Sequence, residues 1–311
     1  MRDREREQWR VKVPAKINLA LHVLDRHDDG YHELLTVFQA VDLWDEIVIR
    51  PSADLAFDCN RPELITKDNL VLRAARRLQQ SCGISTGLRF ELTKRIPIQG
   101  GMGGGSADAA GTLIACNQIW KLGLSVDELS EHGAQLGADV PFFLTGGSAL
   151  GSGRGDSIHA LTPFPRTALM LAIPPFGTAT GELFAAATKR LTLPREAVNF
   201  RAFFEQLDST FLNPSSAVEG DDWMQNDLEA AAFESRPELS LMRDRIQAAG
   251  ARRAMMSGSG STIFGLFANG ASRDRATKAL CAEFPSWNFV STWTISDGVR
   301  MIDCRSTEEG I

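Results

Sequence analysis

The segment that most constrains this chain is a glycine-rich run, Pro97-Ile-Gln-Gly-Gly-Met-Gly-Gly-Gly-Ser-Ala-Asp108, with five glycines between positions 100 and 105. A strand-like stretch, GLRFELTKRIPI, precedes it, and a helix is expected to follow from about Ala107 to Trp120. Glycines permit positive backbone dihedrals and remove Cβ atoms, so consecutive N–H groups can converge on an anion at a helix N-terminus. The run therefore predicts a loop that holds phosphate.

Other interpretations of this run fit less well. Flexible linkers rarely lie between a strand and a helix of a compact domain. A Walker P-loop ends in Gly-Lys-Ser/Thr, and no lysine occurs between Lys94 and Lys121. A dinucleotide fingerprint would place Ser106 where the third glycine belongs. The loop thus resembles a phosphate site of neither common class.

Two polar residues at the end of the run have open roles. Ser106 either N-caps the helix or presents its hydroxyl to a magnesium ion on a nucleotide, and the two uses can coexist. Asp108 in the first turn suits the helix dipole. An acid this close to a triphosphate is expected only beside a cation or turned away from the ligand.

The length of 311 residues favours two domains with a cleft between them. We place the boundary near residue 165, where prolines bracket a strand-like stretch, TALMLAI. No apolar run approaches the roughly 18 residues that span a bilayer. The first ten residues are too charged for a leader, so we expect a cytoplasmic protein.

Charge and cysteine usage narrow the function classes. The net charge is -6, and no basic block is interleaved with aromatics, which argues against a nucleic-acid partner. The five cysteines are far apart and form no Cys-x-x-Cys pair. They are expected to be free thiols and not a disulfide framework or a zinc site.

Further elements follow from periodicity. Residues 11 to 24 alternate as a strand interrupted at Pro14, and a second strand follows at TVFQAVDLWDEIVI. Helices are expected over 68–82 with Asp68 as N-cap, and over 126–136 behind a capping box at Ser125 and Glu128. In the second half, helices at about 179–190, 224–234 and 237–249 alternate with strands at ARRAMM, STIFGLF and VSTWTI, which indicates an α+β domain.

Several polar residues stand in apolar or turn surroundings: Lys16, Asn18, Tyr31, His32 and Asp139. Each has an ordinary explanation when taken singly, such as a solvated strand lysine, a surface histidine or an aspartate that caps a turn before Val140-Pro141. Beside a phosphate loop they become a possible active site.

Five blocks of sequence carry a resemblance to a known family. They are Pro14-Ala-Lys-Ile-Asn-Leu, Asp29-Gly-Tyr-His, the run at 97–108, Ala138-Asp-Val-Pro-Phe and Met256-Ser-Gly-Ser-Gly-Ser-Thr. Together they resemble the 4-diphosphocytidyl-2-C-methyl-D-erythritol kinases of the GHMP kinase superfamily. Family loops commonly read Gly-Ala-Gly-Leu-Gly-Gly-Gly-Ser-Ser, whereas this chain has Gln99, Met102 and Ala107. Ala107 removes one hydroxyl that could contact phosphate or metal.

The resemblance implies a two-domain α+β GHMP kinase fold. Residues 1–165 would form the ATP-binding domain, which is like ribosomal protein S5 domain 2, and residues 166–311 a ferredoxin-like domain. The implied reaction transfers the γ-phosphoryl group of ATP to the 2-hydroxyl of 4-diphosphocytidyl-2-C-methyl-D-erythritol, in the non-mevalonate route to isoprenoid precursors. ATP and Mg²⁺ are the implied cofactors, and a cytoplasmic monomer or homodimer without nucleic-acid or membrane partners is the implied state.

The resemblance also assigns roles to residues. Asp139 would accept the hydroxyl proton and Lys16 would keep that carboxylate ionised. Tyr31 and Phe184 would stack on cytosine and His32 would read its edge, with Asn18 and Thr180 at the sugar or diphosphate; Phe38 either shapes this pocket or packs in the core. The implied nucleotide-binding residues are Asn69, Leu70, Lys94, Pro97, Ile98, Gln99, Gly100, Gly101, Met102, Gly103, Gly104, Gly105, Ser106 and Ala107, with Ser106 also implied at the metal. The Ser257–Thr262 glycine loop either closes the cleft from the second domain or is a structural turn.

Three rival functions stay open at this point. The chain could phosphorylate another small alcohol, such as homoserine or a mevalonate derivative, which needs no cytidine cage. It could bind nucleotide as a regulator, although a proton acceptor beside Lys16 has no obvious use there. A nucleic-acid-binding module shares part of the architecture but should carry a basic surface.

Overall fold

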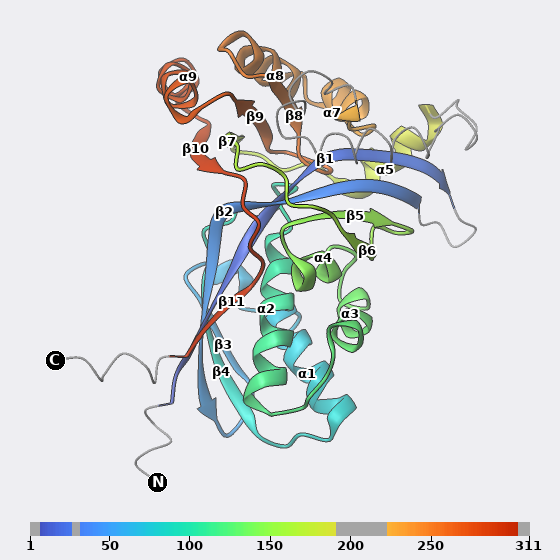
Figure 1. Cartoon of the computed structure of the whole chain (residues 1–311), viewed down its shortest axis with the longest axis vertical. Coiled ribbons are helices and arrows are strands. Elements are labelled where there is room, and N and C mark those ends of the chain that lie inside the picture. The colour runs from blue at the N-terminus through green and yellow to red at the C-terminus, as the bar shows by residue number, and fades with distance from the viewer. Residues whose placement is uncertain (1–6, 27–31, 191–222, 304–311) are drawn as a thin grey trace, which may run out of the picture.

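The computed structural model describes residues 7–26, 32–190 and 223–303, which form two sheets with helices packed on them (Figure 1). The large sheet has the strand order β11-β1-β2-β4-β3, with β5 paired to β2 and β6 paired to β5. Its strands are β1 (Trp9–Arg26), β2 (His32–Ser52), β3 (Ala56–Cys59), β4 (Gly87–Thr93), β5 (Ser148–Ser152), β6 (Ser157–Ala160) and β11 (Arg300–Asp303). The small sheet has the order β10-β7-β9-β8, from β7 (Ala168–Ile173), β8 (Arg253–Met256), β9 (Ile263–Phe267) and β10 (Asn288–Trp293).

The helices cover one face of each sheet (Figure 1). Those beside the large sheet are α1 (Leu70–Cys82), α2 (Gly104–Ile119), α3 (Val126–Ala134) and α4 (Val140–Thr145). Those beside the small sheet are α5 (Thr180–Arg190), α7 (Glu229–Ser235), α8 (Pro237–Ala248) and α9 (Gly270–Glu283). This arrangement confirms the expected α+β class.

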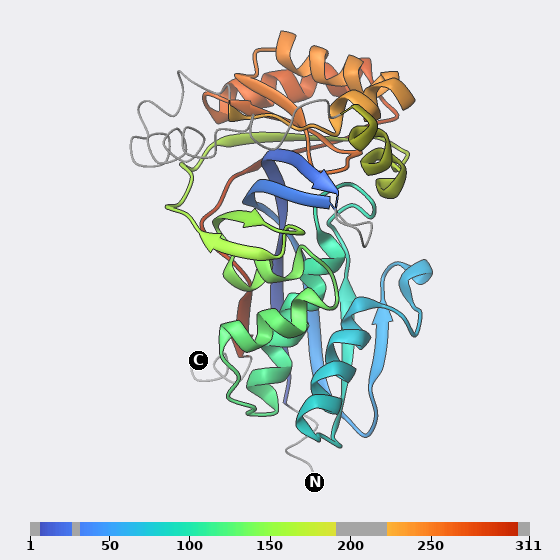
Figure 2. The ribbon, with the colours of Figure 1, turned by 90° about the vertical axis from the view of Figure 1, so that its right-hand side faces the viewer.

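The β1–β2 hairpin joins the two halves. Its far end reaches the small-sheet half, as Figure 2 shows from the side. The β1–β2 register shifts between Pro14 and Ala15 and again between Asn18 and Ala20, which confirms the predicted interruption at the proline. A buried apolar cluster spans the junction, with Ile17 from β1 beside Leu171 from β7 and Phe264 from β9. The two halves therefore share one buried core at this junction.

Helix starts differ from the sequence predictions in three places, and one of them is α7, which begins at Glu229 and not at about residue 224. α2 begins at Gly104, three residues before Ala107, because Gly103 takes the N-cap position with φ +67°. α1 begins at Leu70 with Asn69 as its cap and not Asp68; the Asn69 side chain accepts from Val71 N–H and also donates to Leu64 O, at 3.0 Å. The capping box at the start of α3 is confirmed.

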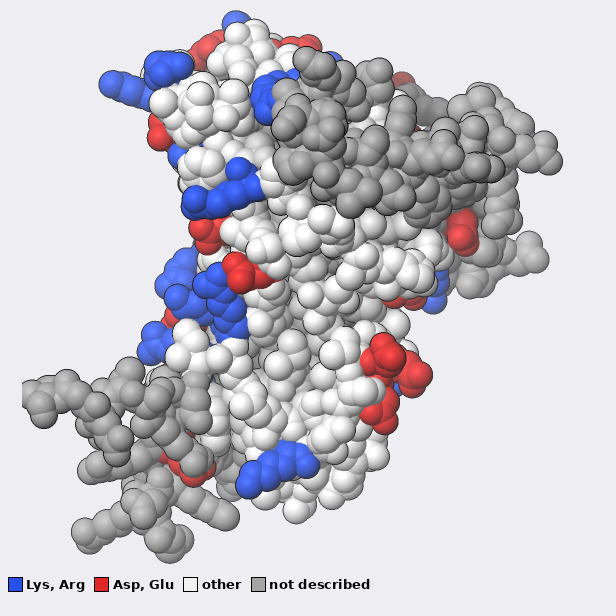
Figure 3. Space-filling model, viewed as in Figure 1, with Lys and Arg blue, Asp and Glu red and all other residues white. Residues whose placement is uncertain are grey.

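The second half of the chain also contributes to the large sheet, because β11 pairs with β1 after the small sheet is complete. The division at residue 165 stays a prediction. The described cysteines, Cys59, Cys82, Cys116 and Cys281, are free thiols, and Cys304 lies outside the described residues. On the face in Figure 3, described acidic and basic side chains are interspersed. Within the described residues, none of the helices is long and apolar enough to cross a membrane.

Candidate active site

The glycine-rich run leaves β4 and enters α2, as its composition predicts. Gly101 and Gly103 have φ of +72° and +67°, and a Cβ atom on Gly103 would lie 2.7 Å from the Phe143 ring. Ser106 is the third residue of α2 and not its N-cap, so its role as a cap is wrong. The first N–H groups of a helix lack partners within the helix, so this terminus suits an anion.

A cavity of about 710 Å³ opens over the run and the start of α2. Its lining includes nearly all of the predicted nucleotide residues, namely Asn69, Leu70, Lys94 and Pro97 through Ser106. Ala107 is fully buried in the core, and its N–H donates to Gly103 O at 2.9 Å. From the small-sheet half, Thr178, Thr180 and Ser259 complete the wall.

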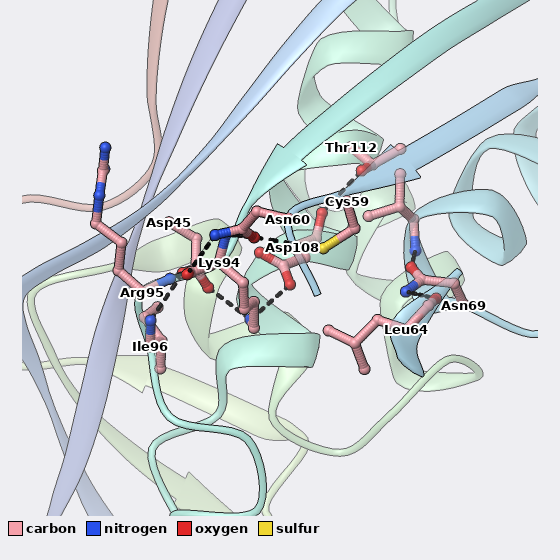
Figure 4. Close-up of polar contacts among 11 residues, drawn as sticks. Asp45, Cys59, Asn60, Leu64, Asn69, Lys94, Arg95, Ile96, Asp108 and Thr112 are labelled. Atoms are coloured by element: carbon pink, nitrogen blue, oxygen red, sulfur yellow. Dashed lines mark hydrogen bonds and ion pairs between the residues drawn. The ribbon is translucent and has the colours of Figure 1, made fainter. Parts of the chain in front are cut away.

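Beneath this cavity Lys94 lies between two buried carboxylates (Figure 4). Its Nζ lies 2.5 Å from Asp45 Oδ2 and 2.7 Å from Asp108 Oδ2. Asp45 Oδ1 also accepts from Arg95 N and Ile96 N, which fixes the start of the loop. Asp108 thus stands beside a cation, as an acid near a phosphate site must.

The pKa values of this cluster reflect burial and charge together. Burial would lower the pKa of Lys94, but Asp108 and Asp45 outweigh it and raise that pKa. Burial raises the pKa of Asp108 to about 7, against the attraction of Lys94. Asp108 Oδ1 has no hydrogen-bond partner within the described part of the chain.

The second polar centre joins Lys16 to Asp139. Lys16 Nζ donates to Asn18 Oδ1 at 2.7 Å and lies 3.3 Å from Asp139 Oδ2. Asn18 in turn donates to Thr36 Oγ1 at 2.7 Å, and the lysine side chain is only 5% exposed. Asp139 occupies the N-cap position of α4, yet no capping bond from its side chain occurs among the described residues. Its carboxylate faces the lysine instead.

The second glycine loop, residues 257–262, lies against the first glycine loop and against the Lys16–Asp139 centre. Ser257 Oγ donates to Gly101 O at 3.0 Å, so the two glycine loops are in direct contact. A Cβ atom on Gly258 would lie 3.0 Å from Asn18 Oδ1 and 3.3 Å from Lys16 Nζ. Glycine is therefore required where the loop passes over the ammonium group.

A second cavity of about 520 Å³ lies beside Ala138, the residue that precedes Asp139. It is lined by Leu34, residues 134–138, Arg154 and Gly181 together with His32 and Phe184. The His32 and Phe184 rings stack at 5.3 Å, and the Thr188 hydroxyl lies 2.5 Å from His32 Nε2.

The other predicted substrate residues are distributed differently. Tyr31 lies outside the described residues. Thr180 faces the first cavity, with its hydroxyl 2.9 Å from Ser259 Oγ. Phe38 is 1% exposed and stacks on Phe142, so it packs in the core, where its ring centroid lies 5.4 Å from Lys16 Nζ.

Sequence reasoning missed some polar residues of the site. Asp45 gave no signal because its partner Lys94 is 49 positions away in the chain. Arg154 stands in a tight turn between Gly153 and Gly155, both with positive φ, and that flanking pattern could have marked it. The described residues contain no group of three or more His, Cys, Asp or Glu that could hold a metal ion.

Comparisons with known proteins identify the family to which this chain belongs. A protein of Pelotomaculum thermopropionicum named 4-diphosphocytidyl-2-C-methyl-D-erythritol kinase is 40% identical over 258 residues, which are 82% of this chain and 88% of the relative. The chain belongs to this kinase family. Within it, residues 69–147 match the model of the GHMP kinases N terminal domain, and residues 213–286 match that of the GHMP kinases C terminal domain.

Solved structures agree with the family assignment. A crystal structure of 4-(cytidine 5'-diphospho)-2C-methyl-D-erythritol kinase matches with a TM-score of 0.76 and 33% identity, over 93% of this chain and 100% of that one. Homoserine kinase from Cytophaga hutchinsonii reaches the same TM-score of 0.76 at 21% identity, over 96% of this chain and 98% of that one. The latter likeness shows the shared fold alone. The predicted GHMP kinase fold is confirmed.

Proposed function

We propose that this kinase transfers the γ-phosphoryl group of ATP to the 2-hydroxyl of 4-diphosphocytidyl-2-C-methyl-D-erythritol, a step toward isoprenoid precursors by the non-mevalonate route. The observation that carries the proposal is the position of the Lys16–Asp139 pair. Lys16 N–H donates to the carbonyl of Met102, which lines the first cavity, and Asp139 follows Ala138, which lines the second. Donor and acceptor ligands in the two cavities would meet at this pair.

In the first cavity, the phosphates of ATP would lie on the N–H groups of the glycine run and the start of α2. Asn69 and Leu70 would border the nucleotide at the start of α1, and the Lys94 ammonium lies under Gly104, 2.7 Å from where a Cβ would be. Gln99 has φ +56° and its side chain lies beside Gly177 of the other half. Both halves would therefore enclose the nucleotide.

The residues present fit a magnesium ion carried by the phosphates. Magnesium keeps several waters and takes only one or two protein ligands beside phosphate oxygens. Ser106 Oγ lies 3.5 Å from the Cβ position of Gly137, so the hydroxyl faces the segment that leads into Asp139. Ser106 would hold the ion, which when bound would neutralise charge on the phosphates.

Catalysis would depend on positioning and charge. Asp139 would accept the proton of the attacking hydroxyl, and Lys16 would stabilise the negative charge that spreads over the phosphoryl group. Asn18 holds the ammonium in place from the same strand. The Lys16 side chain is almost fully buried, so water competes little for its charge.

In the second cavity, the substrate's cytosine would be held by aromatic rings. Phe184 and Tyr31 would stack on the base, and His32, which lines the same cavity as Phe184, would read the base edge through hydrogen bonds. Arg154 would pair with the diphosphate in this cavity. Asn18 beside Lys16 and Thr180 in the wall of the first cavity would contact the sugar or diphosphate portion where it leaves the second cavity toward the first. A kinase for homoserine or mevalonate would need no such rings.

The proposal is tested by coupled ADP release. Turnover is measured with 4-diphosphocytidyl-2-C-methylerythritol beside homoserine and mevalonate, each with ATP and Mg²⁺. Turnover of the cytidylyl substrate is expected, and turnover of the controls alone would overturn the proposal. Protection of the second cavity by CMP but not by homoserine is the matching binding result.

We also propose the cellular setting and the division of the chain. The kinase would act in the cytoplasm as a monomer or homodimer, since its ligands are small soluble metabolites. Residues 1–165 would form the nucleotide-binding domain and residues 166–311 the second domain. Gel filtration with light scattering would measure the oligomeric state.

A further inference from the structure

Residues 225–229 contact both β1 and the second glycine loop, and they line neither of the two cavities described above. Leu21 of β1 donates its N–H to Gln225 O at 2.8 Å and accepts from Asp227 N–H at 3.0 Å. The Asp227 carboxylate accepts a further bond from Val23 N–H at 2.9 Å. The segment is thus fixed to the strand that also carries the site lysine.

From this fixed segment, Asn226 reaches the second glycine loop. Its side-chain Nδ2 donates to Met256 O at 2.9 Å and to Gly258 O at 2.8 Å, while its Oδ1 accepts from Leu228 N–H at 3.0 Å. The residue is 7% exposed. Glu229 adds a bond from Met256 N–H to its Oε1 at 2.7 Å. Asn226 therefore connects both carbonyls of the turn to the β1 half.

The turn that Asn226 holds is the part of the loop nearest the reacting groups. Gly258 lies against Asn18 and Lys16, and Ser257 bonds the first glycine loop at Gly101. A shift of this turn would open space beside the ammonium group. Packing and hydrogen bonds that fix a catalytic group to within a fraction of an ångström are needed for full activity.

We infer that Asn226 is a positioning residue for phosphoryl transfer, which keeps the 256–258 turn against Lys16 so that the ammonium stays directed at Asp139. The inference rests on the proposed function. The role needs two N–H donors facing two carbonyl oxygens, and asparagine supplies them. Aspartate has the same shape but presents acceptors to both carbonyls, so the substitution reverses the interaction with little change in volume.

The first test compares turnover of Asn226→Asp with the parent enzyme. A fall in kcat of about 10- to 100-fold is expected, from about 1.4 kcal/mol per decade for two lost bonds. KM for ATP should change less than about twofold, because the first glycine loop keeps its own contacts. Protonated aspartate regains one donor, so the ratio of variant to parent kcat should rise as pH falls. Asn226→Ala should show the fall without that recovery.

The matched control is Asn117→Asp. Asn117 also clamps a turn, through bonds to Leu124 N–H and O at 3.0 and 2.9 Å, but at the end of α2 remote from the site. It should lose stability with kcat unchanged. Two outcomes would show a merely structural role and overturn the inference. One is an equal fall in kcat for the two variants; the other is a ratio of Asn226→Asp kcat to parent kcat that does not change with pH.

A second measurement does not depend on the substrate. Ser257 N–H donates to Thr262 O and Gly260 N–H to Ser257 O within the loop, so we expect these amides to be protected from hydrogen exchange in the parent. Their exchange should quicken in Asn226→Asp and not in Asn117→Asp. Unchanged exchange of these amides in Asn226→Asp overturns the inference, even if the parent enzyme acts on another alcohol. If exchange quickens but the parent does not turn over the cytidylyl substrate, the result counts only against the proposed function.

Discussion

Lys16 Nζ lies 3.3 Å from Asp139 Oδ2, and this contact joins β1 to the start of α4. The lysine side chain is 5% exposed and that of the aspartate 32%, so the pair has one buried and one accessible member. An accessible carboxylate can reach a substrate hydroxyl, while a buried ammonium keeps a fixed direction. The pair is therefore asymmetric, as the proposed roles of Asp139 as proton acceptor and Lys16 as fixed cation require.

Replacing Asp139 with Asn should remove the proposed proton acceptor while keeping the shape and volume of the side chain. We expect kcat to fall about 10²- to 10⁴-fold, the usual contribution of a general base, with KM for ATP little changed. Steady-state kinetics with saturating substrate measure this. Asp127→Asn, an exposed first-turn residue of α3, should leave kcat as it is. Equal activity of parent and Asp139→Asn would exclude Asp139 as the base.

Gly103→Ala should damage turnover more than stability accounts for. The φ of +67° costs a side chain about 1–2 kcal/mol, and the new Cβ would lie 2.7 Å from Phe143 and 3.2 Å from Lys16 Cε. Gly83→Ala is the matched control, because Gly83 has φ +66° with nothing within 4 Å of its Cβ position. Both variants should lose stability from backbone strain in urea unfolding, Gly103→Ala should lose more because of the contact with Phe143, and Gly103→Ala alone should lose kcat. Parallel kinetics of the two variants would contradict the steric role of Gly103.

Much of the site could be predicted from local sequence because its parts are local signals. A glycine run after a strand predicts an anion site, and Ser125 with Glu128 predicts a helix start, since both depend on backbone groups within a few residues. The start of α2 was misplaced because Gly103, not Ser106, provides the backbone turn that a cap requires. Positive φ at a glycine leaves no periodic pattern to detect.

The contacts that cross the chain could not be predicted in the same way. Asp68 and Asn69 are both good caps, and only the fold, which brings Leu64 O to the Asn69 amide, selects between them. Asn226 is an ordinary polar residue in sequence, and its two bonds reach 30 and 32 positions along the chain. Such partners depend on how the strands are ordered in the sheets, and the periodicity of one sequence does not reveal that order.

The Asp108 carboxyl should make the free energy of unfolding depend on pH. Its folded pKa of about 7 is above the ordinary value of about 3.9, so the folded state binds the extra proton between these values. The stabilisation that the protonated Asp108 carboxyl contributes to the folded state is therefore full at low pH and is lost as pH rises through the folded pKa. In the parent, the free energy of unfolding should therefore fall with pH by up to about 1.4 kcal/mol per pH unit between about pH 4 and 7, and Asp108→Asn should remove this slope. Urea unfolding at a series of pH values measures it, and parallel curves for parent and variant would contradict the assignment.

Phe184→Leu should weaken binding of the cytidylyl substrate and leave ATP binding unchanged. Stacking of a base on an aromatic ring contributes about 1–3 kcal/mol, which predicts a rise in KM for this substrate of roughly 5- to 150-fold. Phe184 lines the second cavity and stacks on His32, whereas the nucleotide cavity does not include it among its described residues. Phe233→Leu is the control, a half-buried ring in α7 under Arg243 that touches neither ligand's proposed position. If the substrate KM rose equally in both variants, or if KM for ATP rose with it in Phe184→Leu, the ring would be acting through packing and not by stacking on the base.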